Sequence, residues 1–188
     1  MKPSGCPPSI FSMAMNRTLD SSPAPAGVAR RAMAFWPVFG GIVVADYLSK
    51  RAAEGRLALH VPYSVAGDVL RLTLTYNTGA AMNLSLGDAS RVAFTALAAM
   101  MLVVIFRMYR RTPHHDTGQA VALAMIAAGA LGNLIDRLRS ARGVVDFIDV
   151  GLGDTRFWTF NVADMGVTCG AALLALLLWR RPEEVGGV

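Results

Sequence analysis

Two aspartates in the C-terminal third of the chain have the type and the placement to do chemistry. Asp146 lies in the segment GVVDF and Asp164 lies in the segment FNVAD, around the start of a strongly hydrophobic stretch. A carboxylate at the edge of a bilayer loses hydration, which is energetically costly. Acidic residues at such positions are therefore expected to have a function. Two carboxyl groups that share one site cannot both ionise cheaply, so one keeps its proton while the other stays charged.

Such a pair supplies an acid and a base for the hydrolysis of a peptide bond. The charged carboxylate takes a proton from water as the water attacks the carbonyl carbon, and the neutral carboxyl group stabilises the oxyanion and protonates the leaving nitrogen. The serines lack a plausible histidine base, and Cys169 lies inside an apolar run, so we find no competing nucleophile. The pair therefore predicts an aspartyl peptidase.

The composition is that of a small polytopic membrane protein. Of the 188 residues, 54% are hydrophobic and 16% are charged, and the mean hydropathy is positive. The chain is too apolar for a soluble domain and too short for more than one core. The net charge of +5 comes from arginines beside apolar segments, which favours membrane lipids over nucleic acid as partners. Cys6 and Cys169 lie in different surroundings, so neither a disulfide nor a metal site is predicted.

Four apolar segments are long enough to cross a bilayer as helices. They cover approximately residues 33–50, 91–108, 119–137 and 161–179, each close to the ~20 residues needed to cross about 30 Å of hydrocarbon. Asp46 and Lys50 interrupt the first segment, but an acid followed four residues later by a lysine can pair on one helix face. We expect disordered cytoplasmic tails at 1–32 and 181–188 around one membrane domain at 33–180.

A polar stretch between the first two spans shows the alternation of a β-strand. Leu72, Leu74 and Tyr76 alternate with polar residues, which is a period of two. Residues 57–65 can pair with this stretch across a turn that contains Gly67. The predicted fold class is thus an all-α membrane protein whose four transmembrane helices carry a small β-sheet between helices 1 and 2.

Four alternating crossings place the notable polar residues on one side of the membrane. The end of the first span, the end of the third and the start of the fourth share that side with the two longer connections. The residues gathered there are Asp46, Lys50, Asn77, Asn133, Asp136, Arg137, Asp146, Asn161 and Asp164. Asn133 with Asp136, and Asn161 with Asp164, are spaced by three residues and share a helix face. The amides can donate hydrogen bonds to the carboxylates.

The arginine clusters indicate the orientation. Lysines and arginines divide equally between the two faces, but the tightest clusters beside the spans lie on the side of the termini, at residues 30–31, 107–111 and 180–181. Basic clusters next to spans face the cytoplasm. The acidic residues are therefore expected on the extracytoplasmic side.

Five motifs resemble, in order, the signature blocks of lipoprotein signal peptidase, also called signal peptidase II. They are DYLSK at 46–50, YNTGAA at 76–81, GALGNLIDR at 129–137, VVDF at 144–147 and FNVAD at 160–164. The resemblance covers roughly residues 33–180. One departure is Met82-Asn83, where the family usually has an aromatic residue after the alanines, and this departure leaves the substrate preference in doubt.

The resemblance implies an aspartyl endopeptidase of the bacterial inner membrane that removes the signal peptide from prolipoproteins. It implies a cut before a cysteine that already carries diacylglycerol, an extracytoplasmic sheet that cradles the substrate, and no cofactor. Asp146 and Asp164 match the catalytic dyad. The matched residues that line or brace the site are Asp46, Lys50, Asn77, Gly79, Asn133, Asp136, Arg137 and Asn161. The expected partners are diacylglyceryl-modified prolipoproteins and membrane lipids, and we expect a monomer.

Other interpretations stay open from the sequence. A small transporter or proton-conducting protein also uses membrane acids, although it predicts acids through the depth of the bilayer. A non-catalytic binder of lipoprotein precursors would not need both aspartates. Structural ion pairs explain Asp46 with Lys50 and Asp136 with Arg137 equally well, and the two cations are also suited to a lipid phosphate. Asp149 is expected to be a solvated loop carboxylate.

Overall fold

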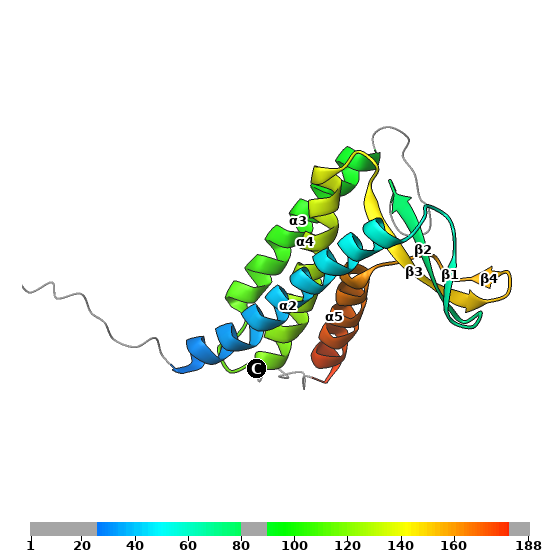
Figure 1. The fold of residues 1–188 in the computed structure, drawn as a ribbon. Helices are drawn as coiled ribbons and strands as arrows, with labels where there is room; N and C mark the ends of the chain where they lie inside the picture. The colour runs from blue at the N-terminus through cyan, green and yellow to red at the C-terminus, as the bar shows by residue number, and fades with distance from the viewer. Residues whose placement is uncertain (1–25, 80–89, 181–188) are drawn as a thin grey trace, which may run out of the picture.

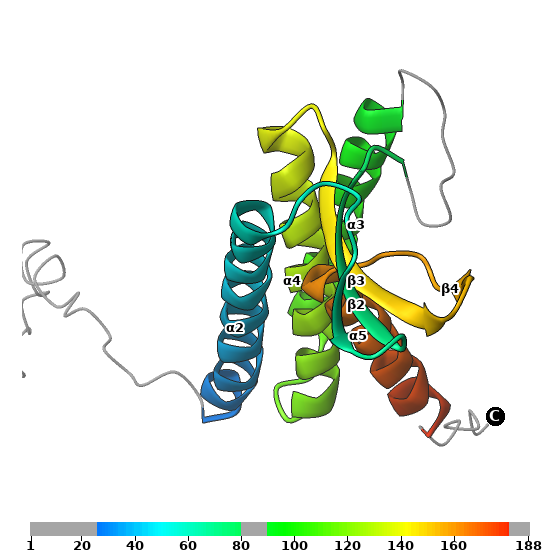
Figure 2. The same ribbon diagram turned by 45° about the vertical axis from the view of Figure 1, so that its right-hand side comes forward.

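The structure, a computed structural model, describes residues 26–79 and 90–180. Within these ranges, four helices lie side by side and a β-sheet stands at one end of them (Figures 1 and 2). The helices are α2 (Ala26–Arg56), α3 (Ser90–Arg111), α4 (Thr117–Arg139) and α5 (Val162–Trp179). Each is long and apolar enough to cross a membrane. The predicted fold, a multi-pass membrane protein with four spanning helices and a small sheet, is confirmed.

The first helix is longer than its apolar segment. α2 begins at Ala26, inside the tail expected at 1–32, and it continues past Lys50 to Arg56. Hydropathy marks only the part of a helix that lies in lipid, whereas alanine, arginine and glutamate at the two ends are good helix formers in water. The rest of the expected N-terminal tail, the expected C-terminal tail and Met82-Asn83 lie outside the described residues.

α4 is the central helix of the bundle. Half of its most apolar window is buried, against 11% to 17% of the corresponding windows in the other three helices. Its small residues allow close packing: a Cβ atom on Gly129 would lie 2.2 Å from the backbone oxygen of Ala163 in α5. Small residues are the usual means of close helix contact in membranes. The positions of α2 and α5 are therefore set by their contacts with α4.

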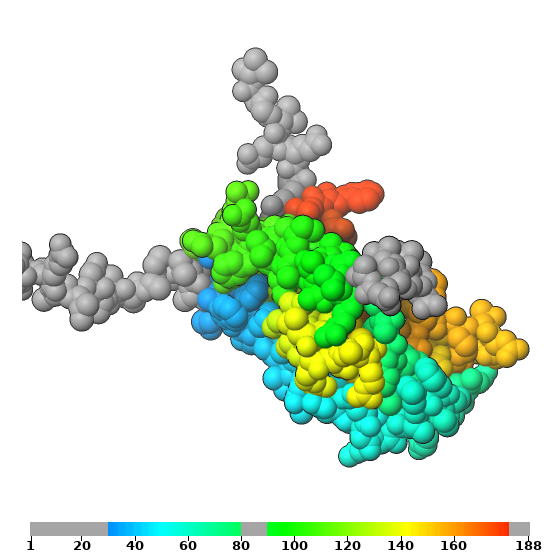
Figure 3. Space-filling model, turned by 90° about the horizontal axis from the view of Figure 1, so that it is seen from above, coloured from blue at the N-terminus to red at the C-terminus, as the bar shows by residue number. Residues whose placement is uncertain are grey.

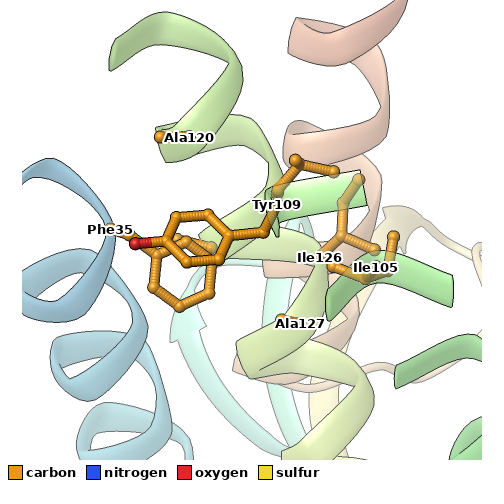
Figure 4. Packing of buried hydrophobic residues seen from close by; sticks show 8 residues of the cluster. Phe35, Ile105, Tyr109, Ala120, Ile126 and Ala127 are labelled. Atoms are coloured by element: carbon orange, nitrogen blue, oxygen red, sulfur yellow. The ribbon is translucent and has the colours of Figure 1, made fainter. Parts of the chain in front are cut away.

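An aromatic cluster closes the bundle at the end away from the sheet. Phe35 of α2 packs on Tyr109 of α3 with ring centroids 4.2 Å apart, against Ala120 and Ala127 of α4 (Figure 4). Arg31 lies over the Tyr109 ring at 4.7 Å and donates a hydrogen bond to the backbone oxygen at position 112, at 2.5 Å. This cluster joins three helices far from the polar residues identified in the sequence.

The sheet combines two separate stretches of the chain. It is antiparallel, with the order β1 (Tyr63–Ala66), β2 (Leu70–Asn77), β3 (Val144–Leu152) and β4 (Thr155–Arg156). The hairpin of β1 and β2 agrees with the alternation in the sequence. β3 and β4 were not predicted, and they lie between α4 and α5 rather than between the first two helices. The first five residues of β3 are nearly all buried, so this strand shows no alternation of polar and apolar residues.

A second apolar cluster fixes the sheet to the helices. Ala53 of α2 packs with Leu74 of β2 and with Val145 and Phe147 of β3. The chain enters β3 through Gly143, whose φ is +100°, and a Cβ atom there would lie 2.3 Å from the backbone oxygen of Asn77. Only glycine fits this turn comfortably. As a result, Asp146 lies on a strand that is anchored on both sides.

Candidate active site

Asp146 of β3 and Asp164 of α5 come together at the junction of the sheet and the helices. Asn161 donates a hydrogen bond from Nδ2 to Asp146 Oδ1 at 2.7 Å, and its backbone N–H donates to Asp164 Oδ2 at 3.2 Å. Both carboxylates therefore bind the same residue. Asp146 is only 3% exposed, whereas Asp164 is half-buried.

Asn161 is also the N-cap of α5. Its Oδ1 accepts a hydrogen bond from the backbone N–H of Asp164 at 2.9 Å, while the Asp164 carboxylate accepts from the backbone N–H of Asn161. This capping box places the Asp164 carboxylate at the N-terminus of the helix, where the aligned peptide dipoles favour negative charge. Asn161 and Asp164 are thus in contact, but through a capping box rather than through a shared helix face, and the Asn161 amide donates to Asp146 instead.

Asn133 of α4 orients the other oxygen of Asp164. Its Nδ2 donates to Asp164 Oδ1 at 2.7 Å, and its Oδ1 accepts from Lys50 Nζ at 3.0 Å and from Asn161 Nδ2 at 3.1 Å. An amide oxygen that accepts from two donors fixes the direction in which the NH2 group points. Asn133 is therefore held with its NH2 group toward Asp164.

Lys50 lies between two buried carboxylates. Its Nζ is 2.8 Å from Asp46 Oδ2 and 2.8 Å from Asp136 Oδ2, and all three side chains are nearly inaccessible to solvent. Asp136 therefore pairs with Lys50, while no contact with its neighbour Arg137 is seen. In the ranges 26–79 and 90–180 no group of three or more His, Cys, Asp or Glu side chains is placed to hold a metal ion.

The same two carboxylates bind the backbone beside the dyad. Asp46 Oδ1 accepts from the backbone N–H of Ala163 at 2.9 Å, and Asp136 Oδ2 accepts from the backbone N–H of Val145 at 3.3 Å. These residues directly precede Asp164 and Asp146 in the chain. Sequence reasoning missed both contacts, because a backbone N–H leaves no signal in the sequence.

Arg137 connects α4 to the end of β2. Its Nη1 and Nη2 donate to the backbone oxygens of Asn133 and Gly79, at 3.3 and 3.1 Å, and its guanidinium lies 6.0 Å from the Phe94 ring. Gly79 in turn donates its N–H to Asn77 Oδ1 at 3.0 Å. All ten residues identified in the sequence thus lie in one connected region at the sheet end of the bundle.

The surroundings of Asp146 favour its protonated form. Burial raises the pKa of Asp146 from its ordinary 3.8 to about 7, and the nearby negative charge of Asp164 acts in the same direction. Hydrogen bonds from Asn161 and Asn77 and the positive charge of Lys50 oppose the increase in pKa but do not cancel it. The dyad thus combines a buried carboxyl group that holds a proton near neutral pH with a second carboxylate in a helix cap.

Asp149 differs from its predicted role as a solvated carboxylate. It is buried, its Oδ1 lies 2.8 Å from Arg156 Nε, and its Oδ2 accepts from Thr73 Oγ1 at 3.0 Å. Arg156 also donates to the backbone oxygen of Asp149. Asp149 therefore stabilises the end of β3 rather than facing water. The nearby Asp154, in the turn between β3 and β4, is exposed.

Comparison with known proteins identifies the family. Membrane-length helices with two carboxyl groups at the end that meets the sheet, Asp146 of β3 and Asp164 of α5, define a multi-pass membrane protein with an acidic site. A family model described as signal peptidase (SPase) II matches residues 38–180. The chain belongs to the signal peptidase II family, as its sequence motifs indicated.

Individual relatives agree with this assignment. The lipoprotein signal peptidase of Hydrogenovibrio crunogenus is 38% identical over 146 residues, which are 76% of this chain and 84% of the relative. That of Ectopseudomonas mendocina is 43% identical over 147 residues, covering 76% and 86% of the two chains. A solved bacterial membrane enzyme is similar with a TM-score of 0.69 at 27% identity, over 79% of this chain and 92% of its own.

Proposed function

We propose that this protein is an aspartyl endopeptidase that removes signal peptides from lipoprotein precursors, with Asp146 and Asp164 as its catalytic dyad. The observation that carries the proposal is the binding of both carboxylates to Asn161, although they come from a strand and a helix that are separate in the fold. The relatives named lipoprotein signal peptidase support the substrate class.

The two aspartates take different roles in the proposed reaction. Asp164 is the base, because its half-exposed carboxylate is oriented by hydrogen bonds from the Asn161 N–H and the Asn133 amide. Asp146 is the acid, because it is buried and carries a proton near neutral pH. Asp164 accepts a proton from the attacking water, and Asp146 stabilises the oxyanion and then supplies the proton for the leaving nitrogen. No covalent intermediate forms.

The support residues act by positioning. Asn161 and Asn133 orient the carboxylates, and the buried group of Asp46, Lys50 and Asp136 holds the backbone on the N-terminal side of each catalytic residue. The remaining matched residues, Asn77, Gly79 and Arg137, connect the end of β2 to α4. Positioning of this kind contributes to catalysis because small displacements of reacting groups are costly.

The proposed cut lies before a diacylglyceryl-modified cysteine. The dyad is at the sheet end of the helices, where a signal helix can enter from the lipid while its lipid-bearing cysteine stays at the membrane surface. The basic residues at positions 30–31, 107–111 and 180 belong to the opposite helix ends. This distribution supports an orientation with cytoplasmic termini and an extracytoplasmic dyad, in the bacterial inner membrane.

The transporter hypothesis gains no support from the fold. In the described helices the acids Asp46, Asp136 and Asp164 meet at one end of the bundle, and α3 contains no acid. Lys50 pairs directly with two of these carboxylates. A relay through the depth of the bilayer would need titratable groups along the helices.

The decisive experiment is cleavage of a purified diacylglyceryl precursor by the full-length protein. Asp146→Asn and Asp164→Asn are expected to slow cleavage by about 10³-fold or more, since each removes one partner of acid–base catalysis. Asp154→Asn, a change of the same charge at an exposed position, should cleave at the wild-type rate. The unlipidated peptide should not be cut, and the reaction should proceed with a chelator present. A wild-type rate in either dyad variant, with membrane insertion intact, contradicts the proposal.

A further inference from the structure

Three arginines surround one glutamate at the sheet end of α2 and α4. Glu54 Oε2 lies 3.1 Å from Arg51 Nη1 and 3.4 Å from Arg139 Nη2, and Glu54 Oε1 lies 3.5 Å from Arg142 Nη2. We name these four residues the Glu54 cluster. The ends of α2 and α4 that carry it lie next to each other at this surface (Figure 3, cyan and yellow). The cluster is separate from the dyad residues.

The charge of the Glu54 cluster is unbalanced. One carboxylate is shared by three guanidinium groups, and the side chains of Arg51, Arg139 and Arg142 are 47%, 36% and 63% exposed. An internal ion pair needs only one arginine. Each guanidinium has five N–H donors in a fixed plane, so a single contact with Glu54 leaves donors for a second acceptor. The cluster therefore has the capacity to bind an additional anion.

The surface of α2 next to the cluster is apolar and exposed, as expected of a surface that faces lipid. Val44, Tyr47 and Leu48 of α2 are large apolar or aromatic residues that are about half exposed, and the Arg51 guanidinium lies 5.6 Å from the Tyr47 ring. Tyrosine is enriched at the depth of the lipid head groups, and arginines near helix ends reach the same level. The Glu54 cluster is thus placed beside the phosphates of one leaflet.

A small groove between α2 and α4 adjoins the cluster. Its lining includes Val43 and Tyr47 of α2, Ile135 of α4, and Arg51 and Arg139 of the cluster. Lys50 and its two carboxylates also border the groove. The exposed side chains of Val44, Tyr47 and Leu48 offer an apolar surface to a chain of methylene groups, while a phosphate diester at its end meets the guanidinium groups.

We propose that the Glu54 cluster binds the phosphate of an anionic phospholipid, with an acyl chain lying along the exposed apolar face of α2. Charge complementarity selects the anionic head group, and the apolar face selects the attached chain over a free anion. This site does not depend on the proposed peptidase function.

The test is retention of lipid by the purified full-length protein, measured by native mass spectrometry. Phosphatidylglycerol is compared with phosphatidylcholine that carries the same acyl chains. The wild-type protein is expected to retain phosphatidylglycerol preferentially, and Arg51→Gln and Arg139→Gln should each weaken that retention by about fivefold. The matched control is Arg56→Gln, which removes an exposed arginine from the same end of α2 and should retain phosphatidylglycerol like the wild type.

Three results would overturn the assignment. Equal retention of the two lipids by the wild type would show that the protein does not select lipids by the charge of the head group. A loss in Arg56→Gln as large as that in Arg51→Gln shows a diffuse charge effect instead of a site. Displacement of phosphatidylglycerol by inorganic phosphate shows that the ligand is a soluble anion. Thermal unfolding of every variant is recorded alongside, and a variant that is not folded is replaced by the corresponding Arg→Lys change, which should retain phosphatidylglycerol more weakly than the wild type because lysine lacks the planar fork.

Discussion

Asp46 accepts a hydrogen bond from the backbone N–H of Ala163 at 2.9 Å, across 117 residues of sequence. Ala163 directly precedes Asp164, and Asp136 forms the corresponding bond with Val145, which directly precedes Asp146. Lys50 joins the two supporting carboxylates. The relative placement of the proposed dyad therefore depends on a buried ammonium group whose partners are Asp46, Asp136 and Asn133.

Replacement of Lys50 by methionine should destabilise the protein strongly. It leaves Asp46 and Asp136 buried without a cation, and breaking a buried ion pair costs about 3–5 kcal/mol. Thermal unfolding in detergent measures the loss. Adding Asp46→Asn and Asp136→Asn to the same protein should restore much of the stability, because the three side chains are then neutral, while precursor cleavage stays low. Unchanged unfolding of Lys50→Met would show that the group is not structural.

The rate of cleavage should fall as the pH rises through about 7. Asp146 has to be protonated to act as the acid, and its pKa is raised to about 7 by burial and by Asp164. Measurement of kcat/KM from about pH 5 to about pH 9 reports the ionisation of groups in the free enzyme. A rate that stays constant across this range would exclude Asp146 as the acid. The exposed-site variant Asp154→Asn should give the wild-type profile.

Stability should also decrease with rising pH. Since the pKa of Asp146 is about 7 in the folded protein and 3.8 ordinarily, the folded state binds more protons than the unfolded state between these values. The free energy of unfolding therefore falls from about pH 4 to about pH 7 and then levels off. Asp146→Asn should flatten this part of the curve of unfolding temperature against pH. The same slope in both proteins would assign the effect to other groups.

Asn161→Ser should separate helix capping from orientation of the dyad. Serine is as good an N-cap as asparagine, so the serine variant should lose only the stability that comes from the buried amide, about 1–3 kcal/mol for acceptors left unpaired. Serine has no amide to donate to Asp146 and Asn133, so kcat should fall by about 10²-fold, the scale expected for misplaced catalytic groups. Asn161→Ala, as the comparison, should be less stable than the serine variant by about 1 kcal/mol, because it also loses the helix cap. Wild-type kcat in the serine variant would contradict the orienting role.

Alanine substitutions at glycines of α4 should test the close helix packing. A Cβ atom on Gly132 would lie 2.4 Å from Asp46 Oδ2, and one on Gly129 would lie 2.2 Å from the backbone oxygen of Ala163. Each substitution should cost about 1–3 kcal/mol through overpacking. Gly40→Ala in α2 is the control, because nothing lies within 4 Å of its Cβ position and alanine favours the helix. Thermal unfolding compares the three proteins.

The features that the sequence predicts well are those with a local signal. Hydropathy locates the four helices, alternation locates the hairpin of β1 and β2, and a spacing of three residues brings Asn161 to Asp164. β3 has no such signal, because it is buried on both faces and its residues do not alternate.

The ion pair of Asp136 shows a second reason why the sequence did not predict every contact of the site. Asp136 and Arg137 are adjacent in sequence, but successive side chains on a helix point about 100° apart. Lys50, which is distant in sequence, takes the place between Asp136 and Asp46. Asp149 likewise looks solvated in the sequence and is buried in the structure because Arg156 folds back onto it. Such partners depend on tertiary contacts that the spacing of residues does not reveal.

The division of the sheet between two loops has a consequence for biogenesis. β2 leaves the translocation machinery before α3, whereas its neighbour β3 follows only after two further helices have been inserted. Until then β2 has no partner on that side, and Asp146 has not yet been placed beside Asp164. For the proposed peptidase, this order means that a nascent chain cannot form the dyad until its last transmembrane segment is in place, so that assembly itself would delay the onset of proteolysis.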